Sequence, residues 1–261
     1  MKKGIYQIII LSFCISKTFA QNYINGKTDW ESWGLRGHVS EMTEYIDTDL
    51  VVTDYKFTGE GKIQTISVYK RRKTRSLKDS SKKEFTSTTT KFMRDIDDRI
   101  ASEIDGDGMP GFIKTYRYEK TNDSLKIIIV SNPPSGSIDC PIKDICTYNS
   151  QGQLIKLTMF ACDTIAENYH AIYSYDQNGH LVEIRETDCP TSCLIVKFVN
   201  DIEGNPISSQ TYSQNGQLQE GMNDTTSYVY DSNKNWILKI WNYKRRGKPI
   251  TKKYQRKIIY Y

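Results

Sequence analysis

Three histidines are the first candidates for acid–base or nucleophilic chemistry in this chain: His38, His170 and His180. None lies in a His-Glu-x-x-His helix, beside a serine elbow or in a Cys–His signature, the patterns that set an imidazole against a metal or a nucleophile. His180 follows the glycine of a turn phrase, so we expect a solvated hairpin residue, and we expect the other two in strands. These patterns favour no enzymatic activity.

Metal and nucleotide sites also lack support. Asp105-Gly106-Asp107-Gly108 begins like a calcium loop but lacks its third ligand position and its later bidentate glutamate, so we expect a structural turn. No glycine-rich loop follows a strand and opens a helix, which is the arrangement that cradles phosphates. We therefore predict no metal and no cofactor.

Aromatic and basic residues are the better candidates for binding chemistry. Trp236 and Trp241, with Lys239 and Arg245 nearby, form a candidate ligand surface, because exposed aromatic rings serve as stacking platforms for sugars. The alternative is that these rings fill cross-strand pairs in a sheet. Basic runs at 70–83 and 244–248 indicate either solvated loops and edge strands or a contact for anionic glycans or lipid head groups.

Five cysteines remain once residues 1–20 are set aside, at positions 140, 146, 162, 189 and 193. Their spacing does not fit the usual zinc pairs, and an exported chain favours disulfides. A hairpin closed by Asn149 and Gln153 places Cys140 opposite Cys162.

The following hairpin, closed by Asp176 and His180, places Cys193 beside Cys162, so Cys162 has two candidate partners. Of the two arrangements we favour Cys140–Cys162 together with Cys189–Cys193, which leaves Cys146 free.

The first twenty residues have the pattern of a signal peptide. Lys2 and Lys3 precede the apolar stretch 5–15, and Ala20 offers a small residue for cleavage. Cys14 raises a lipoprotein alternative, which the bulky Phe13 before it disfavours. The apolar stretch is too short to span a bilayer and no later segment is long enough. We predict export to the periplasm, the outer surface or the medium.

The net charge of the chain gives no support for a nucleic-acid partner. Removal of residues 1–20 takes three lysines from the 36 basic residues and none of the 31 acidic residues, so the mature chain is close to neutral. A nucleic-acid partner therefore has no support from global charge.

A repeated turn phrase determines the predicted fold. An aromatic residue, three turn formers, a glycine and an aliphatic residue recur at 57–63, 148–154, 175–181 and 212–218, with degenerate copies at 104–110, 200–206 and 230–236. An Asx residue followed by a left-handed glycine suits a type I turn closed by a glycine bulge. The flanking segments are rich in β-branched and aromatic residues, and their imperfect alternation indicates bulges or strands covered on both sides.

The sequence thus predicts an all-β antiparallel meander of repeated hairpins, forming an extended, twisted or partly closed sheet over 34–261. Residues 21–33 form a separate N-terminal segment, and a long loop is expected near 131–137. Apolar residues spaced by four from Phe92 to Ile104 also suit a helix; we favour a strand over 99–104 and leave 88–98 open.

Tyr175-Asp176-Gln177-Asn178-Gly179-His180-Leu181 resembles the YD repeat of bacterial Rhs-type proteins. The segments 34–45, 230–236, 247–250 and 258–261 are similar to short exported bacterial proteins with the same repeats. The resemblance implies a cell-surface or secreted β scaffold, in some cases associated with carbohydrate. This chain departs from large Rhs proteins in its few copies, irregular spacing and lack of a toxin-like extension, so no shell is implied.

We therefore expect a non-enzymatic exported scaffold or binding protein of the bacterial envelope, with a glycan as the leading ligand and an envelope protein as the other candidate partner. One alternative is an interaction module that pairs through a sheet edge. Another is an exported hydrolase, which requires a carboxylate pair or a Ser/His site that the sequence does not reveal.

Overall fold

The computed structural model describes residues 35–46, 51–71, 85–95, 99–105, 113–121, 123–133, 141–161, 169–189, 193–245 and 247–261. The expected signal peptide, the segment 21–33, Cys140, Cys162, the turn at 106–110 and most of the first basic run lie outside the described residues.

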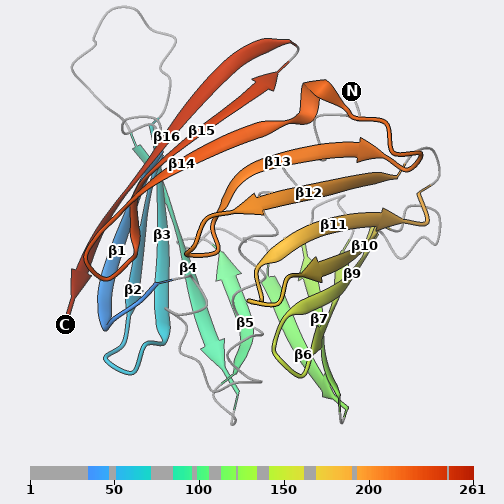
Figure 1. Ribbon diagram of the computed structural model, residues 1–261. Helices are drawn as coiled ribbons and strands as arrows, with labels where there is room; N and C mark the ends of the chain where they lie inside the picture. The colour runs from blue at the N-terminus through green and yellow to red at the C-terminus, as the bar shows by residue number, and fades with distance from the viewer. Residues whose placement is uncertain are drawn as a thin grey trace, which may run out of the picture.

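The described chain forms sixteen strands and one short 3-10 helix (Figure 1). The strands are β1 Val39–Ile46, β2 Val51–Phe57, β3 Ile63–Arg71, β4 Phe85–Arg94, β5 Ile100–Asp105, β6 Ile113–Lys120, β7 Ser124–Asn132, β8 Ile142–Asn149, β9 Leu154–Ala161, β10 Tyr169–Tyr175, β11 Leu181–Thr187, β12 Leu194–Asn200, β13 Pro206–Ser213, β14 Asp224–Tyr230, β15 Trp236–Arg245 and β16 Lys248–Tyr260. The helix η2, Glu220–Met222, precedes β14. The open segment 88–98 is thus strand through Arg94, and the strand expected over 99–104 is confirmed by β5.

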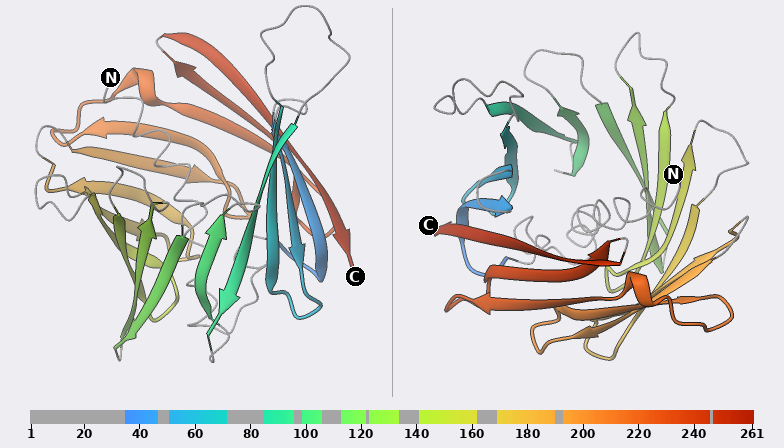
Figure 2. Two further views of the ribbon diagram at one scale, coloured as in Figure 1. Left: turned by 180° about the vertical axis from the view of Figure 1, so that it is seen from behind. Right: turned by 90° about the horizontal axis from the view of Figure 1, so that it is seen from above.

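Each strand pairs antiparallel with its neighbours in sequence, which confirms the predicted meander. The expectation of an extended or partly closed sheet is wrong, because β1 pairs with β16 from Val39 opposite Tyr260 to Ile46 opposite Tyr254 and closes a barrel. Figure 2 shows this closed ring of strands from behind and from above. The hairpin phrase describes pairing only between consecutive strands, so it carries no signal for the pairing of the first strand with the last.

The turn phrases form the predicted hairpin loops. In the turn after β10, Asp176 N donates to His180 O at 2.9 Å and Gly179 N donates to Asp176 O at 3.0 Å. The Asp176 Oδ1 atom accepts from the backbone N–H of Asn178 at 2.9 Å and from that of His180 at 2.8 Å. The turn glycines have left-handed φ values from 75° to 84°: Gly61, Gly152, Gly179, Gly204 and Gly216. Lys234, which replaces glycine in its copy of the phrase, adopts the same conformation at φ 63°.

Each of five hairpins also carries a register shift beside its turn, so the imperfect alternation in the sequence comes from bulges. The shifts lie at Lys56/Phe57, Thr147/Tyr148, Ser174/Tyr175, Val199/Asn200 and Val229/Tyr230.

Tyrosines at the ends of β14 and β16 link these strands to earlier hairpin turns. Tyr230 donates its hydroxyl proton to Asp201 Oδ2 of the previous hairpin turn, and Asn205 of that turn donates to the Tyr230 hydroxyl oxygen at 2.8 Å. The same arrangement recurs one hairpin later, where Tyr260 donates to Asp231 Oδ2 at 2.5 Å. Tyr230, which begins one copy of the phrase, and Tyr260, at the end of β16, thus each couple their strand to an earlier turn.

The last of these links also seals the barrel. Asn235, whose side chain is 1% exposed, donates from Nδ2 to the Tyr260 hydroxyl at 2.7 Å and to Arg36 O at 2.8 Å. Its Oδ1 accepts from Arg36 N at 2.6 Å. One buried amide thus joins the chain segment before β1 to the turn before β15 and to the end of β16.

The strands present their less accessible face to the interior of the barrel. Directly opposed residues share a face of a sheet, and the register aligns Met42 with Tyr55 and Ile258, all of them shielded. Two apolar clusters fill this inner face, one on β7–β10 around Tyr148 and Leu157, the other on β1–β3 and β5 around Met42 and Phe57.

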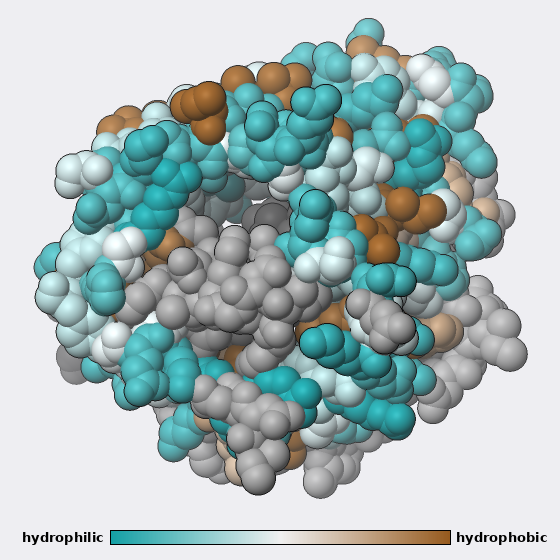
Figure 3. All heavy atoms as spheres, turned by 60° about the horizontal axis from the view of Figure 1, so that its bottom comes forward, coloured by the Kyte–Doolittle hydropathy of each residue, from teal (hydrophilic) through white to brown (hydrophobic). Residues whose placement is uncertain are grey.

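The outer face is mixed in character, because exposed aliphatic residues such as Ile172, Val199, Val229 and Ile259 lie among its polar and charged residues. On β16 the outward positions Thr251, Lys253, Gln255 and Lys257 are all exposed. Exposed charged residues also point outward on other strands: Glu41, Lys56, Lys91, Arg117, Lys126, Lys156, Arg185 and Lys197. On the face shown in the space-filling view, most of the coloured residues are hydrophilic, with apolar residues in small groups (Figure 3).

Two turn glycines give a matched test of this geometry. A Cβ atom at Gly204 would lie 2.5 Å from His180 Cδ2, whereas one at Gly216 meets nothing within 4 Å; their φ values are +83° and +84°. We expect Gly216→Ala to lower the free energy of unfolding by about 1–2 kcal/mol, which is the cost of a left-handed backbone conformation at a residue with a side chain. Gly204→Ala should lower the free energy of unfolding by more than Gly216→Ala does, because the His180 ring must also move. Urea denaturation measures both, and equal losses would contradict the packing of His180 on the neighbouring turn.

Candidate functional site

The inner face of β14, β15 and β16 carries a continuous set of aromatic side chains, here called the aromatic wall. Its members are Tyr228, Tyr230, Trp236, Trp241, Tyr243 and Tyr254. The register places Tyr228 opposite Lys239, and Lys239 opposite Tyr254, so rings from three strands lie on one side of the sheet. The bulge beside Tyr230 brings Trp236 onto the same face, opposite Tyr230.

Trp241 forms the centre of a stacked pair. Its ring centroid lies 4.2 Å from that of Tyr243, with an interplanar angle of 24°. The indole Nε1 donates to Asp224 Oδ2 at 2.9 Å, and Ser209 Oγ donates to Asp224 Oδ1 at 2.8 Å. A carboxylate is thus held in a fixed position beside two stacked rings.

Trp236 lies at the other end of the wall and is covered by a cation. The Arg256 guanidinium carbon is 3.5 Å from the Trp236 ring centroid, and Arg256 Nε donates to Glu44 Oε2 at 3.0 Å. The two charged side chains are only 9% and 17% exposed. Burial lowers the pKa of Arg256, and Glu44 opposes that shift. Trp236 is therefore part of a packed ion-pair site rather than a free ring.

Lys239 lies between the two tryptophans, with Nζ 5.3 Å from the Tyr254 ring centroid and 6.0 Å from that of Tyr228. Arg245 is exposed at the end of β15, opposite Lys248 at the tip of the β15–β16 hairpin. Of the four residues selected from the sequence, the fold brings Trp236, Lys239 and Trp241 onto the wall and leaves Arg245 at its rim.

A second polar region lies on the opposite side of the interior, on β5, β6 and β8. Glu103 is buried; Lys114 Nζ lies 3.1 Å from its Oε2, and Tyr116 donates its hydroxyl proton to its Oε1. Asp144 faces the same interior, between Ile129 and Met159 on the adjacent strands. Its Oδ1 atom is shielded from solvent and has no hydrogen-bond partner. Burial raises the pKa of Asp144 to about 6, and the Lys114 charge opposes that shift.

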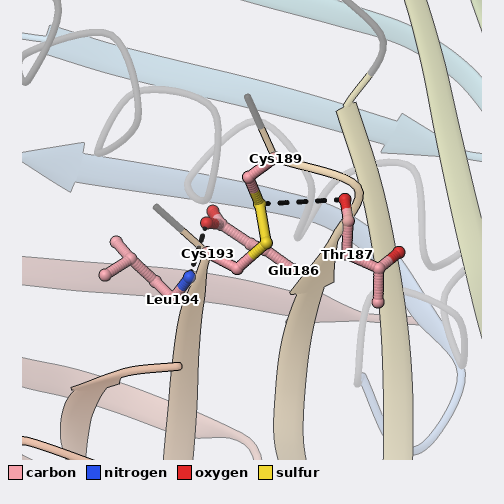
Figure 4. The surroundings of a disulfide bond; sticks show 5 residues. All are labelled: Glu186, Thr187, Cys189, Cys193 and Leu194. Atoms are coloured by element: carbon pink, nitrogen blue, oxygen red, sulfur yellow. Dashed lines mark hydrogen bonds between the residues drawn. A yellow bond between two sulfur atoms is a disulfide. The ribbon is translucent and has the colours of Figure 1, made fainter. Parts of the chain in front are cut away.

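The predicted disulfide Cys189–Cys193 is confirmed, with a Cα–Cα distance of 5.3 Å. It closes the connection between β11 and β12, beside Glu186, whose Oε2 accepts from Leu194 N at 2.9 Å (Figure 4). The contact between Cys189 Sγ and Thr187 O, at 3.7 Å, is a close approach and not a hydrogen bond, because a disulfide sulfur has no proton. The pairing Cys140–Cys162 lies outside the described residues.

Cys146 is a free thiol, as expected, and it is buried on the inner face of β8. Burial raises its pKa to about 12. A thiol with so little thiolate character is a packing residue and a poor nucleophile.

The histidines lie apart from one another. His170 is in β10, as expected, with Nδ1 3.1 Å from Thr158 Oγ1. His38 lies one residue before β1 rather than in a strand. His180 was expected to be solvated, but its side chain is 26% exposed because the Gly204 turn packs against it.

Within the described ranges, no three His, Cys, Asp or Glu side chains are grouped so that they would hold a metal ion. No helix in the described part of the chain combines the length and apolar character needed to cross a membrane.

Sequence reasoning missed Asp224, Arg256 and Asp144, because each acquires its environment from strands distant in the chain. Only the repeated interval of 29 residues between Asp201 and Tyr230, and between Asp231 and Tyr260, signals a long-range link.

No family model matches this chain, and no curated protein matches it. Among solved structures, it is similar to a porin-like protein from Bacteroides uniformis, with a TM-score of 0.55, 12% identity, and coverage of 84% of this chain and 96% of that one. A porin-like protein from Bacteroides vulgatus is 11% identical over 86% of this chain and 99% of that one, with a TM-score of 0.37. The first likeness shows that the barrel fold is shared, and it shows nothing further.

Proposed function

We propose that this chain is a non-enzymatic, exported β-barrel protein that binds a glycan on the aromatic wall inside its barrel. The observation that carries the proposal is the stacked pair of Trp241 and Tyr243 beside the carboxylate of Asp224. Aromatic rings offer a flat apolar face to the C–H face of a sugar ring, and a few placed polar groups fix the orientation of a ligand.

Asp224 is suited to accept hydrogen bonds from the hydroxyl groups of a bound glycan. Each of its oxygens already accepts one hydrogen bond, from Ser209 and from Trp241. A carboxylate offers about four acceptor positions, so about two remain for ligand hydroxyls. Because Ser209 and Trp241 hold the group in place, little conformational entropy is lost when a ligand binds.

Export of the chain is the second part of the proposal. The signal-like residues 1–20 support it, and so does the Cys189–Cys193 disulfide, since disulfides persist in oxidising compartments. The outer face carries charged residues such as Lys126, Arg185 and Lys197 on its strands. In the lipid-facing band of a membrane barrel such a lysine or arginine costs about 2–4 kcal/mol at the midplane. We therefore propose a barrel whose outer face stands in water on the envelope side.

Two alternatives have less support. Pairing through a sheet edge requires a free edge strand, and the strands described form a closed ring. A hydrolase requires a pair of carboxylates that work together, and the two carboxylates of the second polar region are Glu103 on β5 and Asp144 on β8. Three strand spacings separate them, about 14 Å between backbones, against carboxyl separations of about 6.5–9.5 Å in inverting glycosidases.

A polysaccharide array probed with the mature protein tests the proposal. We expect binding to a subset of glycans, and a loss of about tenfold or more for Trp241→Ala, since one ring stack contributes on the order of 1 kcal/mol or more. Ile240→Ala is the matched control, because Ile240 is the next residue in β15 and faces outward. A silent array, or equal binding by both variants with unchanged melting temperatures, would refute the proposed site.

A further inference from the structure

Lys252 on β16 is a partly exposed cation on the inner face of the barrel. Thr251 and Lys253 beside it point outward and are exposed, whereas Lys252 shares the inner face with the buried Tyr254. Among the described residues, none forms a hydrogen bond or an ion pair with the Lys252 side chain. All three donors of its ammonium group are therefore available to water or to a ligand.

The strand register places this lysine directly beside the stacked rings of the aromatic wall. Lys252 lies opposite Trp241 on β15, and the Cβ atoms of directly opposed residues are about 4.5–5.5 Å apart. Asp224 lies on the other side of Trp241, because it belongs to β14 and accepts from the indole Nε1. Two strand spacings, about 10 Å between backbones, separate β14 from β16. A sugar stacked on Trp241 therefore has an ammonium group on one side and a carboxylate on the other.

The rings and the lysine lie on a hairpin that projects past its neighbour and is rich in positive charge. β1 ends at Ile46, opposite Tyr254, so residues 248–253 pair with β15 alone among the described strands, and Figure 1 shows this hairpin extending past β1. Trp241 and Tyr243 both remain partly exposed. The segment 241–253 contains six basic residues and no acidic residue. A cluster of charges of one sign raises the local concentration of ligands of the opposite sign.

We propose that Lys252 is a specificity-determining residue that receives the carboxylate of an acidic sugar stacked on Trp241. This inference rests on the proposed function and names the substrate class of the same site, a glycan whose sugars carry a carboxylate group. The Lys252 ammonium group donates a charge-assisted hydrogen bond to that carboxylate, and Asp224 accepts from hydroxyl groups on the other side of the sugar ring. The two charged residues thus set the direction in which the glycan lies. A neutral sugar lacks the charged acceptor and binds more weakly.

The experiment pairs each acidic polysaccharide with its own methyl ester on one array, probed with the mature protein. The probes are polygalacturonate, alginate and hyaluronan, together with neutral polysaccharides. Esterification removes the negative charge and keeps the sugar backbone, so the comparison isolates the carboxylate. We expect wild type to bind at least one acid form about tenfold more tightly than its ester, the effect of one hydrogen bond to a charged group.

Three variants assign the preference to Lys252. Lys252→Gln should bind the acid form and the ester alike, with the affinity for the ester and the melting temperature unchanged, because the side chain makes no ion pair among the described residues. Lys252→Arg keeps the charge and should keep the preference. Lys253→Gln is the matched control, because it changes the net charge equally at the neighbouring outward position of β16, and it should also keep the preference.

The outcomes separate the two proposals. If wild type binds only neutral glycans, or binds every acid form and its ester equally, the assignment of Lys252 is wrong while the aromatic wall still stands as the glycan site. The same holds if Lys252→Gln keeps the preference, or if Lys253→Gln loses it to the same extent, because the preference then reflects overall charge. If no glycan binds wild type, or if Trp241→Ala binds as wild type does, both proposals fail.

Discussion

Asn235→Ala is expected to lower the free energy of unfolding by about 3 kcal/mol. The substitution removes three hydrogen bonds from a side chain that is 1% exposed, two to the backbone of Arg36 and one to the Tyr260 hydroxyl. Each such bond contributes about 1 kcal/mol, and the Arg36 backbone groups would lose their partners. Urea denaturation followed by circular dichroism measures the loss.

Asn205→Ala is the matched control, because Asn205 occupies the equivalent position one turn earlier. It donates to the Tyr230 hydroxyl at 2.8 Å, as Asn235 does to Tyr260, but the connection to Arg36 belongs to Asn235. The control should therefore cost about 1 kcal/mol. Equal losses in the two variants would mean that the Arg36 contact does not stabilise the closure of the barrel.

Glu44→Ala is expected to destabilise the barrel by about 3–5 kcal/mol, the usual cost of breaking a buried ion pair by removing one partner. Glu44 and Arg256 lie directly opposite each other across the β1–β16 seam, and both are largely buried. Removal of Glu44 would leave the Arg256 guanidinium without its carboxylate partner in a poorly solvated site. The midpoint of thermal unfolding should fall accordingly.

A compensating change distinguishes this electrostatic explanation from a loss of packing. With Glu44→Leu and Arg256→Met combined, no unpaired charge remains, and stability should return to within about 1–2 kcal/mol of wild type, since apolar replacement of a buried pair is often neutral. Glu183→Ala, which breaks an ion pair to the half-exposed Arg185, should cost less than about 1 kcal/mol. A double variant less stable than Glu44→Ala would contradict the argument.

The local architecture could be predicted from the sequence because it depends on residues close together in the chain. Asp176 and Gly179 specify their turn by themselves, the aspartate through its side-chain acceptor and the glycine through its left-handed backbone. The bulges that follow from such turns explain the broken alternation of the strands. Lys234 adopts the glycine conformation because Asp231 supplies the same side-chain contacts in that turn.

Closure of the barrel could not be predicted, because it depends on residues almost a full chain length apart. The contact of Arg36 with Asn235 spans 199 positions, and neither residue belongs to a pattern that indicates the other. The resemblance to YD-repeat proteins remains a prediction. The link from Tyr230 to Asp201 nevertheless gives the aromatic position of that phrase a physical role in joining adjacent hairpins.

The candidate site was predicted in part. Trp241 and Lys239 were selected as aromatic and basic neighbours, and alternation along β15 does bring them onto one face. Trp236 joins them only through a bulge, and the carboxylate that completes the site, Asp224, is on another strand. Residue type and spacing identified the aromatic rings. Their polar partners, such as Asp224, could not be identified, because the strand register that brings them together does not follow from nearby sequence.

Polymer-maleimide labelling of two adjacent positions in β14 tests most directly whether the aromatic face is the interior of the barrel. Thr226 lies opposite Trp241 and is half-buried, whereas Ser227 lies opposite Ile240 and is exposed. In detergent-free buffer, Ser227→Cys should react with the bulky reagent at least about tenfold faster than Thr226→Cys, since only outward thiols are accessible to it. Faster labelling at position 226 would show that the two faces are assigned the wrong way round. A protein that stays in solution only in detergent would contradict an outer face that stands in water.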